Sequence, residues 1–317
     1  MGDNIKFAIQ REKRKGITFL TLKNLTTKES VEVIPEHGGT VNKIFFLMND
    51  GIENILFSDK DNEIKKNPLF RGRILFPFND IIPGGKYNFN GREYGLKIND
   101  PKTNTAIHGF LYREKMEIVS EEIGEDSCSL LLRREFGQVR GYPFPITLAL
   151  KYTLKDSSIR LDFFIANSGS TPLPLALGWH PYFTFNNFPD DVVLKSDSEG
   201  YVEVDEDLLP TGKILSCRNT KFDFRNGKSL ANFNIDNALK VPENGITVIS
   251  QGKNRISIEQ DTKIFKFIQL YIPDDHGAIA VEPISAATNS FNNSLPGLIT
   301  LLPGEEVKTF AVISTSK

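Results

Sequence analysis

The stretch Ile146-Thr147-Leu148-Ala149-Leu150-Lys151-Tyr152-Thr153-Leu154 alternates larger apolar side chains with small or polar ones. Successive side chains of a strand point to opposite faces of a sheet, so this period of two predicts a strand with one buried face. A second alternating run, from Ile159 to Ala166, follows the polar segment Lys155-Asp156-Ser157-Ser158. Two such runs joined by a short polar loop indicate an antiparallel hairpin.

The same period recurs elsewhere in the chain, in shorter runs at residues 17–22, 31–34, 129–136, 255–259, 265–272 and 306–313. The 24 glycines and 17 prolines often stand together, as in Pro83-Gly84-Gly85, and such pairs are typical of turns. We find no long stretch with the 3.6-residue period of an amphipathic helix, no dividing linker and no fixed-period repeat. The sequence therefore predicts an all-β chain, with few short helices, that forms one domain over residues 1–317.

The composition excludes several classes of protein. Hydrophobic residues make up 39% of the chain and charged residues 25%, which is ordinary for a soluble globular protein. The formal net charge of −2 argues against a nucleic-acid partner, because such proteins present a basic surface. The two cysteines cannot form a disulfide framework, and we see neither a secretory signal nor an apolar run of about 18 residues. We expect a cytoplasmic monomer or homodimer that has no membrane partner.

The segment Leu177-Gly178-Trp179-His180-Pro181-Tyr182-Phe183 holds the chain's single tryptophan and one of its four histidines. Histidine titrates near neutral pH and is therefore suited to moving protons under physiological conditions. Pro181 restricts His180 to extended backbone, so His180 is predicted at a strand end or in a turn. The neighbouring aromatic residues indicate a cleft suited to a sugar, although Trp179 could equally fill the core.

Three further segments contain candidate functional residues: Arg71–Phe78, Thr105–Phe110 with His108, and Ile279–Pro283 with Glu282. Glu282 precedes a proline, which predicts a strand that ends there and directs the carboxylate out of the sheet. The histidines lack metal-ligand spacing, and we see no glycine-rich phosphate loop. We therefore expect neither a metal nor a cofactor.

Together these segments resemble the aldose 1-epimerase (galactose mutarotase) family, from about Gly38 to Pro303. The resemblance is carried by short motifs in a fixed order: Gly38-Gly39-Thr40-Val41, Arg73-Ile74, His108-Gly109, Gly141-Tyr142-Pro143, His180-Pro181-Tyr182-Phe183, Gln269-Leu270-Tyr271 and Glu282-Pro283. It implies the family's fold, a large antiparallel β-supersandwich. It also implies that the substrate is a small-molecule sugar, such as free glucose or galactose, whose α and β anomers are interconverted.

The resemblance implies a role for each matching residue. Glu282 corresponds to the general base that takes the proton of the anomeric hydroxyl, and His180 to the general acid that protonates the ring oxygen. His108 corresponds to a second histidine near the anomeric centre. The expected sugar-binding residues are Arg73, Asp236 and Gln269. Ring opening, rotation about C1–C2 and reclosure need one proton removed and one delivered, and a carboxylate and an imidazolium can do both.

Two departures from the family pattern leave the sugar open. Gly72 stands where many members have asparagine, and His108-Gly109-Phe110 resembles the hexose-6-phosphate 1-epimerase branch, which binds phosphate with arginines. Arg71, Arg73 and Arg113 are the candidates for that purpose. A hexose-6-phosphate 1-epimerase is thus one alternative. A non-catalytic sugar-binding protein on the same fold is a second, since fold does not fix function.

Each candidate residue also has a purely structural interpretation. A single buried histidine is usually just hydrogen-bonded, a lone glutamate is usually solvated or ion-paired, and Asp236 could form an Asx turn. Arg73 could be ion-paired to a carboxylate. A glycoside hydrolase would need a second carboxylate about 5–9.5 Å from Glu282, and nothing in the sequence assigns that part to Asp236 or another acid.

Overall fold

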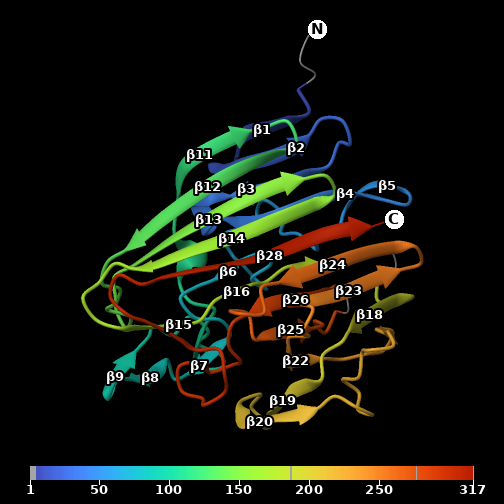
Figure 1. Ribbon diagram of the computed structural model, residues 1–317. Helices are drawn as coiled ribbons and strands as arrows, with labels where there is room; N and C mark the ends of the chain where they lie inside the picture. The colour runs from blue at the N-terminus through green and yellow to red at the C-terminus, as the bar shows by residue number, and fades with distance from the viewer. Residues whose placement is uncertain (1–4, 186–187, 276, 317) are drawn as a thin grey trace.

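The computed structural model describes residues 5–185, 188–275 and 277–316, and strands make up most of this part of the chain (Figure 1). Its helical elements are two 3-10 turns, η1 (Pro35–His37) and η2 (Leu111–Arg113). None of the described helices is long and apolar enough to cross a membrane. The prediction of an all-β chain with few short helices is confirmed.

The predicted hairpin is the centre of the largest sheet, where β13 and β14 pair with Leu150 opposite Phe163. Its turn is tighter than predicted, because Lys155 pairs with Ser158 and leaves only Asp156 and Ser157 in the loop. The sheet has nine antiparallel strands, in the order β11 (Glu117–Ile123), β12 (Ser127–Phe136), β13 (Ile146–Lys155), β14 (Ser158–Asn167), β28 (Glu306–Ser316), β24 (Asn254–Gln260), β23 (Ile246–Gln251), β18 (Val192–Ser196) and β21 (Lys228–Ser229).

A second sheet of eight strands carries most of the candidate site. Seven of them follow in the order β20 (Pro210–Ser216), β19 (Gly200–Val204), β22 (Asp236–Lys240), β25 (Phe267–Tyr271), β26 (Ile279–Ile284), β16 (Gly178–Trp179) and β6 (Ile74–Leu75). The eighth, β17 (Tyr182–Phe183), also pairs with β26. β26 therefore pairs with β25 and with both β16 and β17, which brings residues 178–183 next to residues 267–284.

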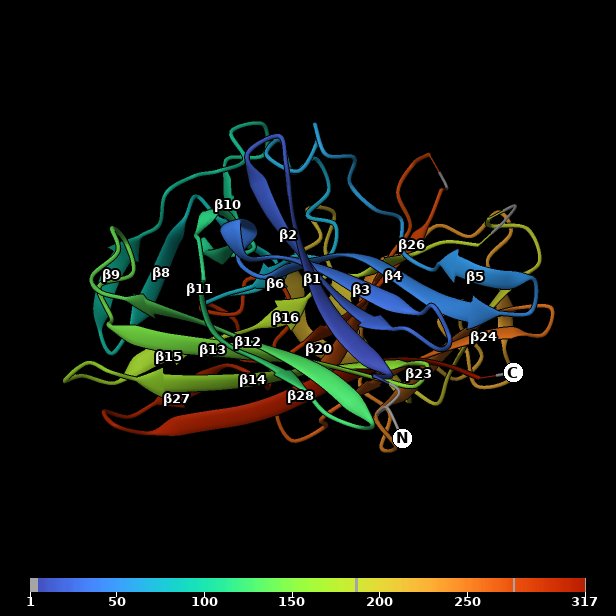
Figure 2. The same ribbon diagram turned by 90° about the horizontal axis from the view of Figure 1, so that it is seen from above.

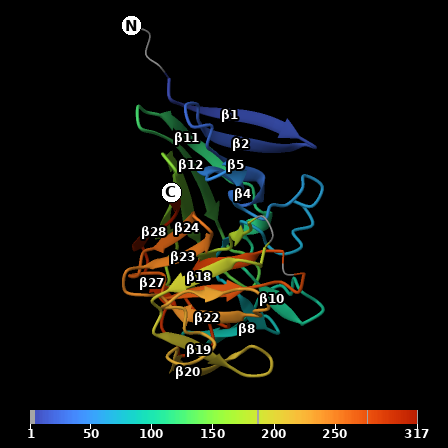
Figure 3. The same cartoon turned by 90° about the vertical axis from the view of Figure 1, so that its right-hand side faces the viewer.

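A third sheet of five strands covers the β11–β13 part of the largest sheet (Figure 2). It is a simple meander of β1 (Phe7–Arg14), β2 (Ile17–Asn24), β3 (Ser30–Ile34), β4 (Thr40–Met48) and β5 (Gly51–Asn54). Figure 3 shows β1 and β2 at one end of the molecule and β19 and β20 at the other. Three two-stranded pairs complete the fold: β7 (Ile81–Pro83) with β10 (Thr105–Ile107), β8 (Lys86–Phe89) with β9 (Arg92–Gly95), and β15 (Leu173–Leu175) with β27 (Ile299–Leu301).

The hydrophobic core runs between the sheets as one large cluster of buried side chains. Leu150 and Phe163 of the largest sheet, Val33 of the five-stranded sheet and Leu270 of the eight-stranded sheet all belong to it. Trp179 is fully buried in the same cluster, so it packs in the core and does not line the cavity described below. Burial of this kind of apolar surface is the main favourable term in folding, and here it holds the three sheets against one another.

Candidate active site

A cavity of about 910 Å³ opens over the eight-stranded sheet. Its lining includes five of the six predicted site residues: His108, His180, Asp236, Gln269 and Glu282. A cavity of this size lies within the range of small-molecule binding sites.

Three of these side chains come from adjacent strands of one sheet. Glu282 on β26 lies directly opposite Gln269 on β25, and Gln269 lies opposite Ala238 on β22. Asp236 is two residues before Ala238 and therefore points to the same face of the sheet. The strand pairing alone thus places a carboxylate, an amide and a second carboxylate in a row.

The strand that carries Glu282 is longer than predicted. β26 continues through Pro283 to Ile284, so the prediction that the strand ends at Glu282 is wrong. A proline removes only one hydrogen-bond donor from a strand. Ile284 still pairs with Gly178 of β16, and the strand continues. Glu282 therefore lies inside a sheet and is only 3% exposed.

His180 lies between β16 and β17, as the proline after it predicts. Its main-chain N–H donates to the carbonyl of Arg73 over 3.0 Å, and its carbonyl accepts from Gly72 over 2.8 Å. The ring stacks on that of Tyr182, with 4.9 Å between centroids and 13° between planes. Bonds on both main-chain sides and a stacked ring hold the imidazole in one orientation.

Nδ1 of His180 lies 3.5 Å from Oε1 of Glu282, and neither side chain is more than 6% exposed. Within the described part of the chain, Nδ1 has no hydrogen-bond partner. Burial lowers the pKa of His180 well below its usual value, and His108 lowers it further. Burial raises the pKa of Glu282 well above its usual value, and Asp80 and Asp236 add to that rise. Both groups are thus biased toward their neutral forms.

His108 faces His180 edge to face, with ring centroids 5.1 Å apart. Its backbone has a φ of 58°, and Gly109 follows at a φ of 71°. A Cβ on Gly109 would lie 1.9 Å from the carbonyl oxygen of Phe76, so only glycine fits there. Burial lowers the pKa of His108 to about 3. The ring is therefore neutral near pH 7.

Asp236 and Gln269 form a hydrogen-bonded pair in the cavity, since Nε2 of Gln269 donates to Oδ1 of Asp236 over 2.7 Å. Partial burial raises the pKa of Asp236 to about 6, and the charge of Asp80 contributes to this rise. Oε1 of Gln269 is buried and has no partner among the described residues. The pair can therefore offer both donors and acceptors to the hydroxyl groups of a ligand.

Asp80 also lines the cavity, although the sequence analysis did not single it out. Its carboxylate accepts hydrogen bonds from the hydroxyl of Thr288 and, over 2.8 Å, from the main-chain N–H of Ile81. Burial raises its pKa. The sequence feature that could have identified Asp80 is the polar pair Asn79-Asp80, which directly follows the apolar run Ile74–Phe78. Polar residues at the end of such a run are candidates for a buried functional position.

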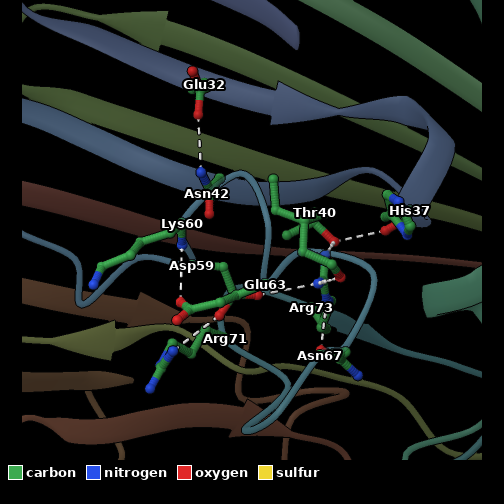
Figure 4. A network of polar contacts seen from close by, with 11 residues as sticks. Glu32, His37, Thr40, Asn42, Asp59, Lys60, Glu63, Asn67, Arg71 and Arg73 are labelled. Carbon is green, nitrogen blue, oxygen red and sulfur yellow. Dashed lines mark hydrogen bonds and ion pairs between the residues drawn. The ribbon is translucent and has the colours of Figure 1, made fainter. Parts of the chain in front are cut away.

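Arg73, predicted to bind sugar hydroxyls, is not among the residues that line the cavity. It is fully buried, and its Nη2 lies 3.2 Å from Oδ2 of Asp59 (Figure 4). The guanidinium also donates, over 2.7 Å in each case, to Thr40 Oγ1, Asn67 Oδ1 and the carbonyl of Ile64. Arg73 is thus ion-paired to a carboxylate, which is the structural interpretation considered in the sequence analysis, and its predicted contact with sugar hydroxyls has no counterpart in this cavity lining. Its bonds fix the segment between residues 59 and 73.

Arg71 shares the same carboxylate, because its Nη1 lies 3.0 Å from Oδ1 of Asp59. Of the three arginines considered for phosphate, only Arg113 lines the cavity. The three candidate arginines therefore do not gather at the cavity. Within the described residues, no group of three or more His, Cys, Asp or Glu side chains is arranged to hold a metal ion.

Comparison with known proteins gives a consistent result. The family model described as aldose 1-epimerase matches residues 20–314. The uncharacterized protein YihR of Escherichia coli is 25% identical over 233 residues, which cover 72% of this chain and 74% of that protein. Human galactose mutarotase is 26% identical over 190 residues, covering 57% of this chain and 53% of the human protein.

Solved structures show the same fold. A galactose mutarotase-like protein from Clostridium acetobutylicum superimposes with a TM-score of 0.86 at 20% identity, covering 99% of this chain and all of that one. Galactose 1-epimerase from Lactobacillus acidophilus gives 0.82 at 18% identity, with 99% of both chains covered. Because the family model matches nearly the whole chain, the chain belongs to the aldose 1-epimerase family.

Proposed function

We propose that this protein is an aldose 1-epimerase that interconverts the α and β anomers of a hexose by acid–base ring opening and reclosure. The observation that carries the proposal is the buried pair His180–Glu282, 3.5 Å apart at the wall of a cavity of small-molecule size. Mutarotation requires two proton-transfer groups beside one sugar carbon, and this pair supplies them.

In the proposed reaction, Glu282 takes the proton of the O1 hydroxyl as the C1–O5 bond breaks, and His180 gives a proton to O5. The product is the open-chain aldehyde, in which C1–C2 rotates. Reclosure reverses both transfers on the other face of C1, with no change in oxidation state. His108 donates a hydrogen bond to a sugar oxygen, while Asp236 and Gln269 bind hydroxyl groups.

The pair His180–Glu282 is active when the imidazole and the carboxylate together carry one titratable proton. The state with ionised Glu282 and protonated His180 has the same number of protons as the state in which both groups are neutral. Burial favours the neutral state, because an ion in a low-dielectric site loses its hydration. The charged state is reached by moving one proton over a short distance, and each group is then a stronger base or acid than it would be in water.

The test is polarimetry of freshly dissolved α-D-glucose and α-D-galactose with the wild-type protein and with Glu282→Gln. We expect clear acceleration by the wild type and its loss in the variant, by about 10²–10⁴-fold. Binding of sugar without acceleration by the wild type would favour the non-catalytic binding protein. Hydrolysis of a nitrophenyl glycoside without mutarotation would favour the hydrolase, for which Asp80 or Asp236 would supply the second carboxylate.

A further inference from the structure

Four cationic side chains line one part of the cavity: Lys65, Lys66, Lys102 and Arg113. All four are exposed. None has an ion-pair partner in the part of the chain that the structure describes, whereas Arg71 and Arg73 are both paired with Asp59. Cations of one sign gathered on a concave surface create a local positive potential that attracts anions.

The three segments that carry these cations converge on Tyr112, which is only 5% exposed. The ring of Phe70, which follows Lys65 and Lys66 in the same loop, meets the Tyr112 ring edge to face at 5.0 Å. In the loop that carries Lys102, Nδ2 of Asn99 donates to the Tyr112 hydroxyl over 2.8 Å. The Arg113 guanidinium lies 4.9 Å from the centroid of the Tyr112 ring. The cations thus come from loops that are tied to one buried side chain.

Phe70 also relates this group to the catalytic pair. Its ring contacts that of His108 at 4.6 Å, and His108 in turn contacts His180. The row of rings from Tyr112 through Phe70 and His108 to His180 places the cations and the acid–base pair along one cavity. A ligand that reaches His180 can therefore extend toward Tyr112.

The other side of the cavity would not accept an anion. Asp80, Asp236 and Glu282 lie there; charge repulsion from Asp80 raises the pKa of both Asp236 and Glu282, and Asp236 adds to the rise at Glu282. The acid on the Tyr112 side is Asp100, whose carboxylate already accepts from the Thr103 hydroxyl over 2.7 Å and from the main-chain N–H of Lys102 over 3.1 Å. A negatively charged substituent has one favourable place in this cavity.

We propose that Lys65, Lys66, Lys102 and Arg113 form an anion subsite around Tyr112, which binds a phosphate, sulfonate or carboxylate group on the aldose substrate. The charged group lies on the part of the sugar remote from the anomeric carbon. This inference rests on the proposed function, because it concerns the same cavity. The charge comes chiefly from lysines and not from the arginine cluster that the sequence suggested.

The experiment compares kcat/KM for the mutarotation of glucose, glucose 6-phosphate and glucuronate, which are neutral, phosphorylated and carboxylated forms of one ring. At low ionic strength we expect wild type to prefer one or both charged sugars by about tenfold or more, and salt to reduce this preference. In Lys65→Gln/Lys66→Gln, and in Arg113→Gln, the charged sugars should lose about tenfold while glucose is unchanged. The matched control Lys13→Gln/Lys253→Gln removes two exposed lysines outside the cavity and should leave all three sugars unaffected.

Tyr112→Phe adds a test of the proposed organisation, because it removes the hydrogen bond from Asn99 and keeps the ring. It should lower the preference for charged sugars without abolishing the turnover of glucose. Equal use of charged and neutral sugars by wild type would overturn the subsite, as would equal losses for both in the lysine variant. If wild type accelerates no sugar, the proposed function fails. Calorimetric binding of glucose 6-phosphate then decides the subsite by itself: binding that weakens in the lysine variant supports it, and unchanged or absent binding overturns it.

Discussion

The main-chain N–H of Asp80 donates a hydrogen bond to Nδ1 of His108 over 3.1 Å. A ring nitrogen that accepts a hydrogen bond carries no proton, so the proton of the neutral imidazole is on Nε2. The carbonyl of Asp80 accepts from the main-chain N–H of His108 over 3.0 Å, which makes the contact reciprocal. His108 is therefore held as a neutral imidazole that can donate only from Nε2. In His180, by contrast, Nδ1 faces Glu282.

This arrangement predicts that His108 does not become charged between pH 5 and pH 8. Its pKa is lowered to about 3 by burial, and protonation of Nδ1 would break the bond from Asp80. Nitrogen NMR of the histidine rings should show the tautomer protonated at Nε2 throughout that range. The same residue in urea-unfolded protein should titrate near the ordinary value of about 6.5. Titration of the folded ring near neutral pH would refute the assignment.

The pH dependence of the rate tests the proposed pair. With two protons on the pair, His180 loses its proton first, because burial lowers its pKa. Glu282 then keeps the remaining proton above its ordinary titration range, because burial raises its pKa. After subtraction of the spontaneous reaction, we expect a bell-shaped pH profile of kcat with a plateau. The fall on the acid side, from protonation of His180, lies below the ordinary histidine pKa of 6.5. The fall on the alkaline side, from loss of the proton kept by Glu282, lies above the ordinary glutamate pKa of 4.5.

Substitution of either member should remove this shape from any residual enzymatic rate. The informative variants are Glu282→Gln and His180→Gln, which keep a side chain of similar size. A wild-type rate that keeps rising to pH 10 would contradict the pair, since no essential proton would then be held by the protein.

Arg73 should matter for stability. Arg73→Met leaves the buried Asp59 with one fewer cation, and breaking a buried pair in this way typically costs about 3–5 kcal/mol. The free energy of unfolding, measured with urea, should fall by about that amount. The double variant Asp59→Leu/Arg73→Met should recover part of the loss, because it leaves no unpaired carboxylate. An unchanged free energy of unfolding together with a raised KM would instead place Arg73 in direct contact with the sugar.

Asp236 should make stability depend on pH. Its pKa in the folded protein is about 6, above the ordinary value of 3.8, so folding favours the protonated form. The stabilisation of the folded protein by protonated Asp236 is fully present below pH 4 and is lost as the pH rises through 6. At pH 8 the free energy of unfolding of Asp236→Asn should therefore exceed that of wild type by about 1 kcal/mol, a figure reduced because the side chain is in contact with solvent. At pH 4 the two proteins should be equally stable. Urea unfolding at the two pH values measures this, and a gain of the same size at both would show that the charge is not responsible.

The regular parts of the fold could be predicted because the pleat of a strand leaves a period of two in the sequence. The Leu150–Phe163 pairing follows from that period, but the exact turn does not, since Ser157 adopts a φ of 50° that its residue type does not demand. Strands of two residues, such as β6 and β16, are too short to show any period. The sequence analysis singled out the segments that contain them but predicted no strand at these positions.

The candidate site could be predicted only in part, because a sequence shows which residue types are present but not which way their side chains face. Glu282 and Gln269 were indicated by motifs, and the register then placed them opposite each other. The type of a side chain does not show whether it faces a cavity or the interior, so Arg73 could not be told from a ligand-binding arginine. Asp80 belongs to no motif that we recognised and acts through its backbone bond to His108, which joins residues 28 positions apart.

The position of β28 has a consequence for the order of assembly. In the nine-stranded sheet this strand lies between β14 and β24, and it is synthesised after the other eight strands of that sheet. Until then, the sheet exists as two pieces with unpaired inner edges, and such edges invite pairing with other chains. The largest sheet can therefore close only after residues 306–316 have been synthesised, because β28 alone joins its two parts.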